Sequence, residues 1–131
     1  MKDLPSPHVA EIKEVSLAFL NGLKAAGFRG EIETDLGNRI ACSTDNSIYQ
    51  IMPQAVVYPR DGTDASRVMQ TLQQPAFDGI HIYPRGGGTS TNGQSLGSGI
   101  IVDTSRHMRN ILDYDESTGL VRVEPGLVRD K

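Results

Sequence analysis

The pattern of apolar positions predicts one long helix near the start of the chain. Between residues 8 and 26 the apolar side chains recur at helical spacing, as on one face of an amphipathic helix. Ser6 and Pro7 are typical of the N-cap and the first helical position, and Gly27 is typical of the residue that ends a helix. The positions on this face are Val9, Ile12, Ser16, Phe19, Leu20 and Leu23.

The next stretch, residues 28–54, shows no sustained period. We expect a single strand at residues 39–42, a turn at residues 44–47, and a short helical or extended piece at residues 48–51. Together with the predicted helix, this irregular stretch makes residues 1–52 a lead-in segment ahead of a more regular region.

In the second part of the chain, strands alternate with a helix. The continuous apolar run at residues 55–58 is typical of a strand that is buried on both faces of a parallel sheet. Thr63 or Asp64 begins a helix that Pro75 ends, and residues 80–83 form a second strand. Such a strand–helix–strand unit is expected to cross over with the right-handed sense.

Three further strands are predicted after a glycine-rich stretch. They cover residues 99–103, 111–114 and 120–124, and residues 115–119 form a hairpin turn between the last two. This order predicts an α+β fold with an α/β-like beginning, in which helices flank a small mixed sheet. Because only seven residues follow the last strand, we expect the chain to be a truncated piece of a larger protein.

Composition and charge exclude some classes of function but do not identify one. A chain of 131 residues has room for one domain with a modest core, and its net charge of −3 gives no footprint of nucleic-acid binding. No apolar run approaches the length of a membrane span and the N-terminus lacks a signal-peptide core, so we expect a cytoplasmic protein. The single cysteine, Cys42, is expected to be a small buried residue, and the histidine spacing predicts no metal site.

The most informative feature is a glycine-rich loop at residues 84–99, between two predicted strands. Six of its sixteen residues are glycine, and most of the others carry a hydroxyl or an amide. A loop with so few apolar side chains cannot bury itself, so its N–H groups and hydroxyls must find partners elsewhere. Because glycine has no Cβ and allows positive φ, consecutive N–H groups can converge on an anion. The loop therefore predicts a phosphate or diphosphate site.

Two common phosphate-binding motifs do not fit this loop. The dinucleotide pattern GxGxxG needs a glycine where Thr91 stands, and no helix begins after the loop. The P-loop pattern needs a lysine, which grips the β- and γ-phosphates, where Gln94 stands. The alternative interpretation is that the loop is a flexible surface linker without a ligand. The rigid Pro84–Arg85 start and the apolar strands on both sides argue against this interpretation.

A third pattern does fit. Residues 83–90, Tyr-Pro-Arg-Gly-Gly-Gly-Thr-Ser, resemble the pyrophosphate loop of FAD-binding domains of the vanillyl-alcohol-oxidase/p-cresol-methylhydroxylase (PCMH) type. Residues 53–60 resemble the first strand of that family, residues 99–103 its post-loop strand, and residues 121–126 the segment that closes its first subdomain. On this resemblance, residues 53–131 form the first, incomplete part of such a domain. The sequence before them is similar to large bacterial FAD-linked oxidases, which carry a C-terminal iron–sulfur region and include a D-2-hydroxyglutarate dehydrogenase.

The resemblance implies a set of FAD-binding residues. Backbone N–H groups early in the loop would hold the FAD pyrophosphate, helped by two hydroxyls, and later residues would lie nearer the ribityl chain and the flavin ring. Some relatives bind FAD covalently through a histidine at the position of Thr89, so threonine implies non-covalent FAD. The early residues are Arg85, Gly86, Gly87, Gly88, Thr89 and Ser90, and the later ones are Gly93, Gln94 and Ser95.

The implied function is that of an FAD-dependent 2-hydroxy-acid dehydrogenase, with D-2-hydroxyglutarate as one candidate substrate and the electron acceptor undefined. Substrate-binding residues, catalytic residues and any iron–sulfur cluster are expected downstream of residue 131. This chain alone is therefore expected to bind FAD weakly or not at all and to be inactive. Two alternatives stay open: a related flavoenzyme for lactate, glycolate or a sugar-derived lactone, and a stand-alone, non-enzymatic module that binds nucleotides or anions.

Overall fold

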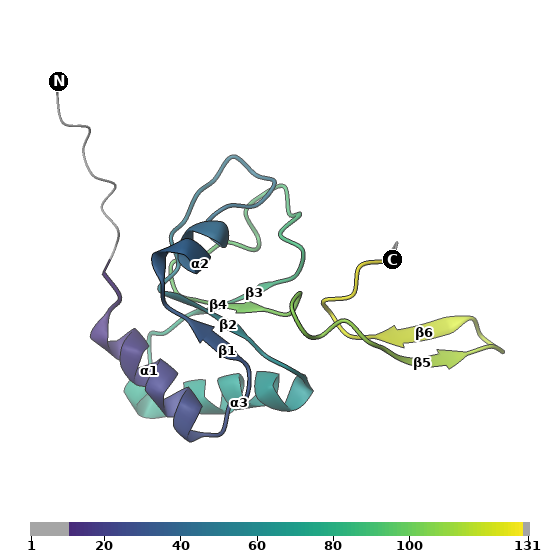
Figure 1. The fold of residues 1–131 in the computed structure, drawn as a ribbon, viewed down its shortest axis with the longest axis horizontal. Coiled ribbons are helices and arrows are strands. Elements are labelled where there is room, and N and C mark those ends of the chain that lie inside the picture. Colours follow the sequence, from purple (N-terminus) through teal and green to yellow (C-terminus); the bar gives the residue numbers. More distant parts are fainter. Residues whose placement is uncertain (1–10, 130–131) are drawn as a thin grey trace.

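The computed structural model describes residues 11–129, in which a two-stranded hairpin extends from a layer of helices and sheet (Figure 1). The helices are α1 (Glu14–Ala25), α2 (Leu36–Ala41) and α3 (Gly62–Leu72), with a 3₁₀ turn η1 (Pro75–Phe77). The strands are β1 (Glu31–Glu33), β2 (Ala55–Tyr58), β3 (Ile82–Arg85), β4 (Ile100–Asp103), β5 (Ile111–Asp115) and β6 (Leu120–Val123). No helix in this part of the chain is both long and apolar enough to cross a membrane.

Four strands form a mixed sheet in the order β1–β2–β4–β3. β2, β4 and β3 are parallel, whereas β1 is antiparallel to β2. In the central register Val56 pairs with Ile101, which pairs in turn with Tyr83. The α+β prediction with a mixed sheet and flanking helices is confirmed. The predicted strand–helix–strand unit also forms, as β2–α3–β3, with β4 inserted between its two strands.

The two faces of the sheet carry two separate apolar clusters, because alternate residues of a strand point to opposite faces. On one face Val57 and Ile100 pack with Phe19 of α1 in the main core, which α3 also covers. On the other face Val56 packs with Cys42, which follows α2 and is 5% exposed. Figure 1 shows α1 and α3 together on one side of the sheet and α2 on the other. The expectation that Cys42 is a small buried residue is confirmed.

Within the lead-in segment, two elements differ from the sequence-based expectation. The strand predicted at residues 39–42 is wrong, because most of these residues belong to α2. Asp35 begins this helix by accepting a hydrogen bond from Asn38 N at 3.0 Å, which satisfies a free N–H of the first turn. β1 escapes prediction because its three residues are too few to show a period. Of the two alternatives predicted for residues 48–51, the helical turn does not form, whereas Gln50 is extended in a β-bridge with Thr44.

The start of the first helix also differs from its prediction. α1 begins at Glu14, and the preceding Lys13 has extended backbone angles. Lys13 N donates to Gln54 Oε1 at 2.7 Å, and this bond holds the N-cap residue out of the helix. The predicted cap at Ser6 and Pro7 lies outside the described residues.

Other boundaries move by only a few residues. α3 begins at Gly62, ahead of the predicted start, because Asp61 accepts a hydrogen bond from Asp64 N at 3.0 Å and caps it. β3 begins two residues later than predicted, because Ile80 N bonds to Phe77 O at 3.0 Å and completes the turn after η1. β2, β4, β5 and β6 lie within one residue of their predicted positions.

Candidate functional site

The glycine-rich loop leaves the sheet at the edge where its parallel strands end. β3 ends at Arg85, and its neighbour β4 ends at Asp103, directly across from it in the register. β2 ends at the same edge with Tyr58. The edge formed by the carboxyl ends of parallel strands is the usual ligand site of open α/β sheets. The fold thus places the start of the loop where a ligand is expected.

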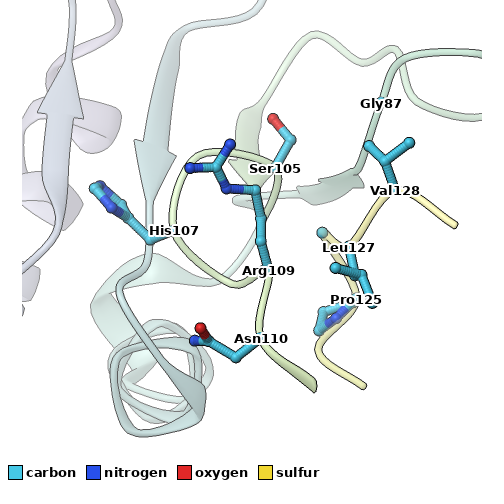
Figure 2. A pocket seen from close by; sticks show the side chains of 9 residues that line it. Gly87, Ser105, His107, Arg109, Asn110, Pro125, Leu127 and Val128 are labelled. Atoms are coloured by element: carbon cyan, nitrogen blue, oxygen red, sulfur yellow. The ribbon is translucent and has the colours of Figure 1, made fainter. Parts of the chain in front are cut away.

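Two hollows open beside the first glycines of the loop. The larger, of about 460 Å³, lies between Gly87, the turn after β4 and the segment after β6 (Figure 2). The smaller, of about 360 Å³, shares Gly87 and Ser105 with it and reaches Cys42 and Tyr58. Polar side chains from the turn after β4 face the larger hollow, and Figure 2 shows them across from residues 125–128. These polar side chains are Ser105, His107, Arg109 and Asn110.

The backbone at the start of the loop is bare. A Cβ added at Gly87 would meet only the Thr89 methyl carbon, at 3.7 Å, and one at Gly86 would meet only Pro125 O, at 3.8 Å. Gly88 has a φ of +67°, and a Cβ there would lie 2.5 Å from Arg85 Nη2. The first two glycines therefore leave open space beside the backbone, and the third allows a turn that other residues cannot make.

Arg85 is fixed at the base of the loop, but one of its nitrogens has no partner. Its Nη2 donates to Thr44 O at 3.0 Å, and its Nε lies 3.9 Å from Asp103 Oδ2. The side chain is 11% exposed, and its Nη1 is buried without a hydrogen-bond partner among residues 11–129. A buried guanidinium N–H without a partner is costly. Arg85 also lines the smaller hollow, together with Gly86 and Gly87.

The turn after β4 is shaped by Asp103. Ser105 donates to Asp103 Oδ1 from its backbone N at 2.8 Å and from its hydroxyl at 2.6 Å. Asp103 therefore caps this turn. Thr104 N also donates to Arg85 O at 2.9 Å, so the turn and the glycine loop start from adjoining backbone.

The same turn is tied to β1 by charged side chains. His107 Nε2 lies 2.6 Å from Glu31 Oε2, and Arg106 Nη1 lies 3.9 Å from Glu33 Oε1. Burial raises the pKa of Glu31, but the hydrogen bond from His107 and the backbone outweigh it, so the pKa lies below its ordinary value. Arg106 also stacks over the ring of Tyr58, 3.5 Å from its centroid. These contacts fix the polar wall of the larger hollow.

The second half of the glycine loop is fastened to the lead-in segment by Asp45. Ser90 Oγ donates to Asp45 Oδ2, and Ser95 Oγ donates to the same oxygen at 3.1 Å. Ser47 N donates to Asp45 Oδ1 at 2.8 Å, which confirms the turn predicted at residues 44–47. Hydrogen bonds from Ser47 and then from Ser90 hold the pKa of Asp45 far below its ordinary value. The carboxyl is therefore ionised at neutral pH.

The structure places the nine predicted FAD-binding residues in two groups along the loop. The first group follows β3 at the hollows, and the second lies against the lead-in segment. A Cβ at Gly93 would lie 3.1 Å from Tyr49 Cδ2, and Gln94 Oε1 accepts a hydrogen bond from Asn92 N at 3.1 Å. The first group is Arg85, Gly86, Gly87, Gly88 and Thr89, and the second is Ser90, Gly93, Gln94 and Ser95. Direct contact of these residues with FAD stays a prediction.

Sequence reasoning did not single out the rest of the site. Asp45 stands in an ordinary turn, and a lone acidic residue there gives no local signal of its role. Arg109 and Asn110 lie far along the chain from the glycine loop, and only the end of β4 brings them to it. The similarity of residues 121–126 to a family segment was the one available signal for the wall at residues 125–128.

A bare glycine backbone, a buried guanidinium and the ends of parallel strands come together at one edge of the sheet. The profile of a family described as FAD binding domain matches residues 53–131, and the chain belongs to this family. The predicted PCMH-type resemblance is thereby confirmed.

Relatives of the chain are dehydrogenases and an oxidase subunit. A D-2-hydroxyglutarate dehydrogenase of Pseudomonas putida is 50% identical over 113 residues, which cover 86% of this chain and 11% of that protein. The D-2-hydroxyglutarate dehydrogenase of Escherichia coli is 44% identical over 120 residues, 92% of this chain and 12% of that protein. The glycolate oxidase subunit GlcD of Bacillus subtilis is 35% identical over 81 residues, 61% of this chain and 17% of that protein. The chain thus spans about a tenth of the length of the dehydrogenases it matches.

A solved structure shares the fold. An alkyldihydroxyacetonephosphate synthase superposes with a TM-score of 0.76 at 21% identity, over 92% of this chain and 24% of that chain. At such low identity the match shows the fold alone. It does confirm that the mixed sheet and its helices form a small part of a larger protein in that case.

The donor set at the loop fits a diphosphate. The open backbone at Gly86 and Gly87 offers N–H groups, and Arg85 and Arg109 offer positive charge beside the hollows. Within residues 11–129 no group of three or more His, Cys, Asp or Glu side chains is placed to hold a metal ion. FAD contains such a diphosphate, whose oxygens could accept hydrogen bonds from these donors.

Proposed function

We propose that residues 85–95 bind the diphosphate of non-covalently held FAD in an FAD-dependent oxidoreductase. The observation that carries this proposal is the open backbone at Gly86 and Gly87 beside the unpartnered, buried Nη1 of Arg85. Diphosphate oxygens would accept hydrogen bonds from both, and Arg109 adds a second positive charge at the larger hollow. The family match supports FAD as the nucleotide.

In this proposal residues 85–90 and residues 93–95 have different roles. The N–H groups of residues 85–90 hold the diphosphate, and the exposed Thr89 adds its hydroxyl. Gly93, Gln94 and Ser95 lie toward the ribityl chain and the flavin. Thr89 has no imidazole for covalent attachment, so binding is non-covalent. FAD itself supplies the redox chemistry when bound, and the residues of this chain bind it, orient it and exclude water from its phosphates.

The loop assignment is tested by titrating the isotope-labelled chain with ADP and following its amide signals. We expect the signals of residues 86–90 to shift at millimolar ADP, and Gly87→Val to abolish the shifts. Because a Cβ at Gly87 meets only Thr89, valine fills the hollow without disturbing the fold. Gly62→Val is the matched control, since a Cβ there meets no atom within 4 Å and lies on α3. Shifts that persist in Gly87→Val, or that map to another surface, contradict the assignment.

We further propose that the substrate of the whole protein is a 2-hydroxy acid, with D-2-hydroxyglutarate as the first candidate. The support is the 50% identity to a D-2-hydroxyglutarate dehydrogenase, together with the weaker similarity to a glycolate oxidase subunit. The proposal gives this chain a binding role, and no proton-abstracting residue is assigned within residues 11–129.

The FAD proposal is also tested in a chimera, and the substrate proposal in the whole protein. Residues of this chain replace the matching segment of the Pseudomonas putida dehydrogenase, and flavin content and oxidation of D-2-hydroxyglutarate, lactate and glycolate are measured. We expect a flavin-loaded chimera that oxidises D-2-hydroxyglutarate fastest, and a flavin-free chimera carrying Gly87→Val. A folded chimera without flavin contradicts the FAD proposal. The substrate proposal is tested on the whole protein to which this chain belongs, with the same three acids, and a flavin-loaded whole protein that is inactive on D-2-hydroxyglutarate contradicts it.

A further inference from the structure

A short segment of the lead-in region, residues 43–51, closes on itself at its base. Ile51 N donates to Ser43 O at 3.0 Å, and Gln50 Nε2 donates to Ser43 Oγ at 3.3 Å. Thr44 and Gln50 form a β-bridge directly above these bonds. We call residues 43–51 the clasp loop. It precedes residue 53, where the family match begins, so the family profile assigns it no part in the cofactor site.

The clasp loop touches the glycine loop at its beginning, at Arg85, and along its middle, at residues 90–95. The contacts are Arg85 Nη2 to Thr44 O at 3.0 Å, the hydroxyls of Ser90 and Ser95 to the carboxylate of Asp45, and the close approach of Gly93 to Tyr49. The glycine loop has little apolar surface of its own to bury, so its shape depends on such contacts.

Asp45 is the centre of the middle contact. One of its oxygens accepts from both serine hydroxyls, and the two hydroxyl oxygens lie 3.1 Å apart. Ser95 N also donates to Ser90 Oγ at 3.3 Å. Residues 90–95 are thereby closed into a turn around a single ionised carboxylate. Hydrogen bonds to an ionised group are about twice as strong as neutral ones, and here two hydroxyls of the loop share one such acceptor.

We propose that Asp45 is a positioning residue of the cofactor site, which holds the glycine loop through Ser90 and Ser95 in the shape that binds a diphosphate. The proposal rests on the proposed function of the loop and adds to it a part of the chain that lies outside the family match. Asp45 does not touch the diphosphate in this proposal; it acts through the two serines.

Because Asp45 is both negatively charged and an acceptor for the loop, its removal has two opposite effects on diphosphate binding. A carboxylate next to a diphosphate site repels the ligand, so removal of the charge alone would strengthen binding. Loss of the loop's shape would weaken binding. Asp45→Ala removes both, and weaker binding in this variant therefore reports the shape of the loop and not its electrostatics.

The experiment uses the whole chain and two readouts. Hydrogen exchange of the ligand-free chain should show the amides of residues 90–95 exchanging at least about tenfold faster in Asp45→Ala, while the amides of β2 and β4 keep their protection. ADP titration should show affinity falling at least about tenfold in the same variant, as expected for loss of a hydrogen bond to a charged group. Asp45→Asn keeps one acceptor oxygen, so it should recover part of both effects.

Asp115→Ala is the matched control. In the hairpin turn, Asp115 likewise accepts hydrogen bonds from Ser117 Oγ at 2.6 Å and Thr118 Oγ1 at 2.8 Å. Its replacement should leave both the exchange of the glycine loop and the affinity for ADP unchanged.

Ser95→Ala keeps the chain's charge and gives a second route if Asp45→Ala unfolds. It should raise the exchange of residues 90–95, and the double variant with Asp45→Ala should add little to Asp45→Ala alone. Unchanged exchange of the glycine loop in both single variants overturns the proposal, as does unchanged or tighter ADP binding in Asp45→Ala. A chimera that carries Asp45 and still retains no flavin overturns the proposed function instead, because that failure does not depend on Asp45.

Discussion

The four-stranded sheet and the β5–β6 hairpin are both regular β-structure, yet they differ completely in burial. Every residue of β2 and β4 is buried, whereas every residue of β5 and β6 is exposed. Helices cover both faces of the sheet, and no described element covers the hairpin (Figure 1). In both regions the strand pattern of the sequence therefore predicts the backbone conformation. It predicts burial only where a neighbouring element packs over the strand.

The hairpin is exposed to solvent although many of its side chains are apolar. Six apolar side chains are between 43% and 69% exposed there: Ile111, Leu112, Tyr114, Leu120, Val121 and Val123. Leu120 and Val121 are adjacent in the regular part of the pairing, so both faces of the ribbon carry apolar groups. An isolated two-stranded hairpin is only marginally stable in water. The described part of the chain thus consists of a packed layer with its own core and a hairpin without one.

The sharpest contrast between the regions comes from two carboxylates, Asp64 and Asp115. Asp64 is fully buried at the start of α3, where it accepts from Arg60 N at 3.1 Å and from Arg67 Nη1 at 2.9 Å. Asp64→Ala leaves these donors without their acceptor, and the partly buried Arg67 loses its ion-pair partner, so we expect a loss of about 3–5 kcal/mol in the free energy of unfolding. Urea unfolding followed by circular dichroism measures it. Asp115→Ala should leave the urea midpoint unchanged, and equal effects at the two sites would contradict the comparison.

A matched pair of isoleucines tests the apolar side of the same contrast. Ile100 of β4 is 0% exposed, whereas Ile111 of β5 is 64% exposed. Ile100→Ala opens a cavity in the main core and should cost about 2–5 kcal/mol. Ile111→Ala removes little buried surface and should stay within about 0.5 kcal/mol. A large loss in Ile111→Ala would show that the hairpin is packed against another part of the chain in solution.

The regions also differ in how far their sequences predicted them. β2 was predictable because Ala55–Tyr58 is a continuous apolar run, and the hairpin because Asp115 to Gly119 is rich in turn residues. α2 was not, because its six residues form a helix through the Asp35 cap and through contact with the sheet, which no local pattern displays.

The candidate site divides in the same manner. The glycine loop was visible in the sequence, because its unusual composition is local. Its attachments were not, since Asp45 stands 45 residues before Ser90 in the chain and meets it only after the sheet has formed. Arg109 reaches the larger hollow for the same reason. Composition predicts that a loop binds an anion, and long-range contacts decide which shape it takes.

Acid should affect the two regions to different degrees. Burial raises the pKa of Asp64, but hydrogen bonds from the backbone of Arg60 and Arg29 and from the Arg67 side chain outweigh it, so the pKa lies below its ordinary value. In the unfolded chain aspartate titrates at about pH 4. As the pH falls, the unfolded chain therefore takes up a proton at this position at a higher pH than the folded chain does. The stability that Asp64 contributes is present above about pH 5 and is lost as the pH falls through the folded-state pKa.

The urea midpoint measured from pH 7 down to pH 3 tests this dependence. The wild-type midpoint should fall with acid, and Asp64→Asn should start lower and fall less steeply. Asp115 also has a pKa below its ordinary value, caused first by the hydrogen bond from the Ser117 hydroxyl. Because this group is exposed in the hairpin, Asp115→Asn should follow the wild-type curve. Identical acid limbs for wild type and Asp64→Asn would contradict the role of Asp64.

The smallest expected effect lies in the hairpin turn. Gly119 has a φ of +69°, a conformation that alanine adopts only with strain, and a Cβ there would meet no atom within 4 Å. Gly119→Ala should therefore weaken only the pairing of β5 with β6, raising the hydrogen exchange of Leu120 and Val121 severalfold, and the urea midpoint of the packed layer should not move. If the midpoint falls together with the hairpin's protection, the two regions unfold as one cooperative unit. In that case the exposed hairpin contributes to the stability of the sheet despite its lack of a core.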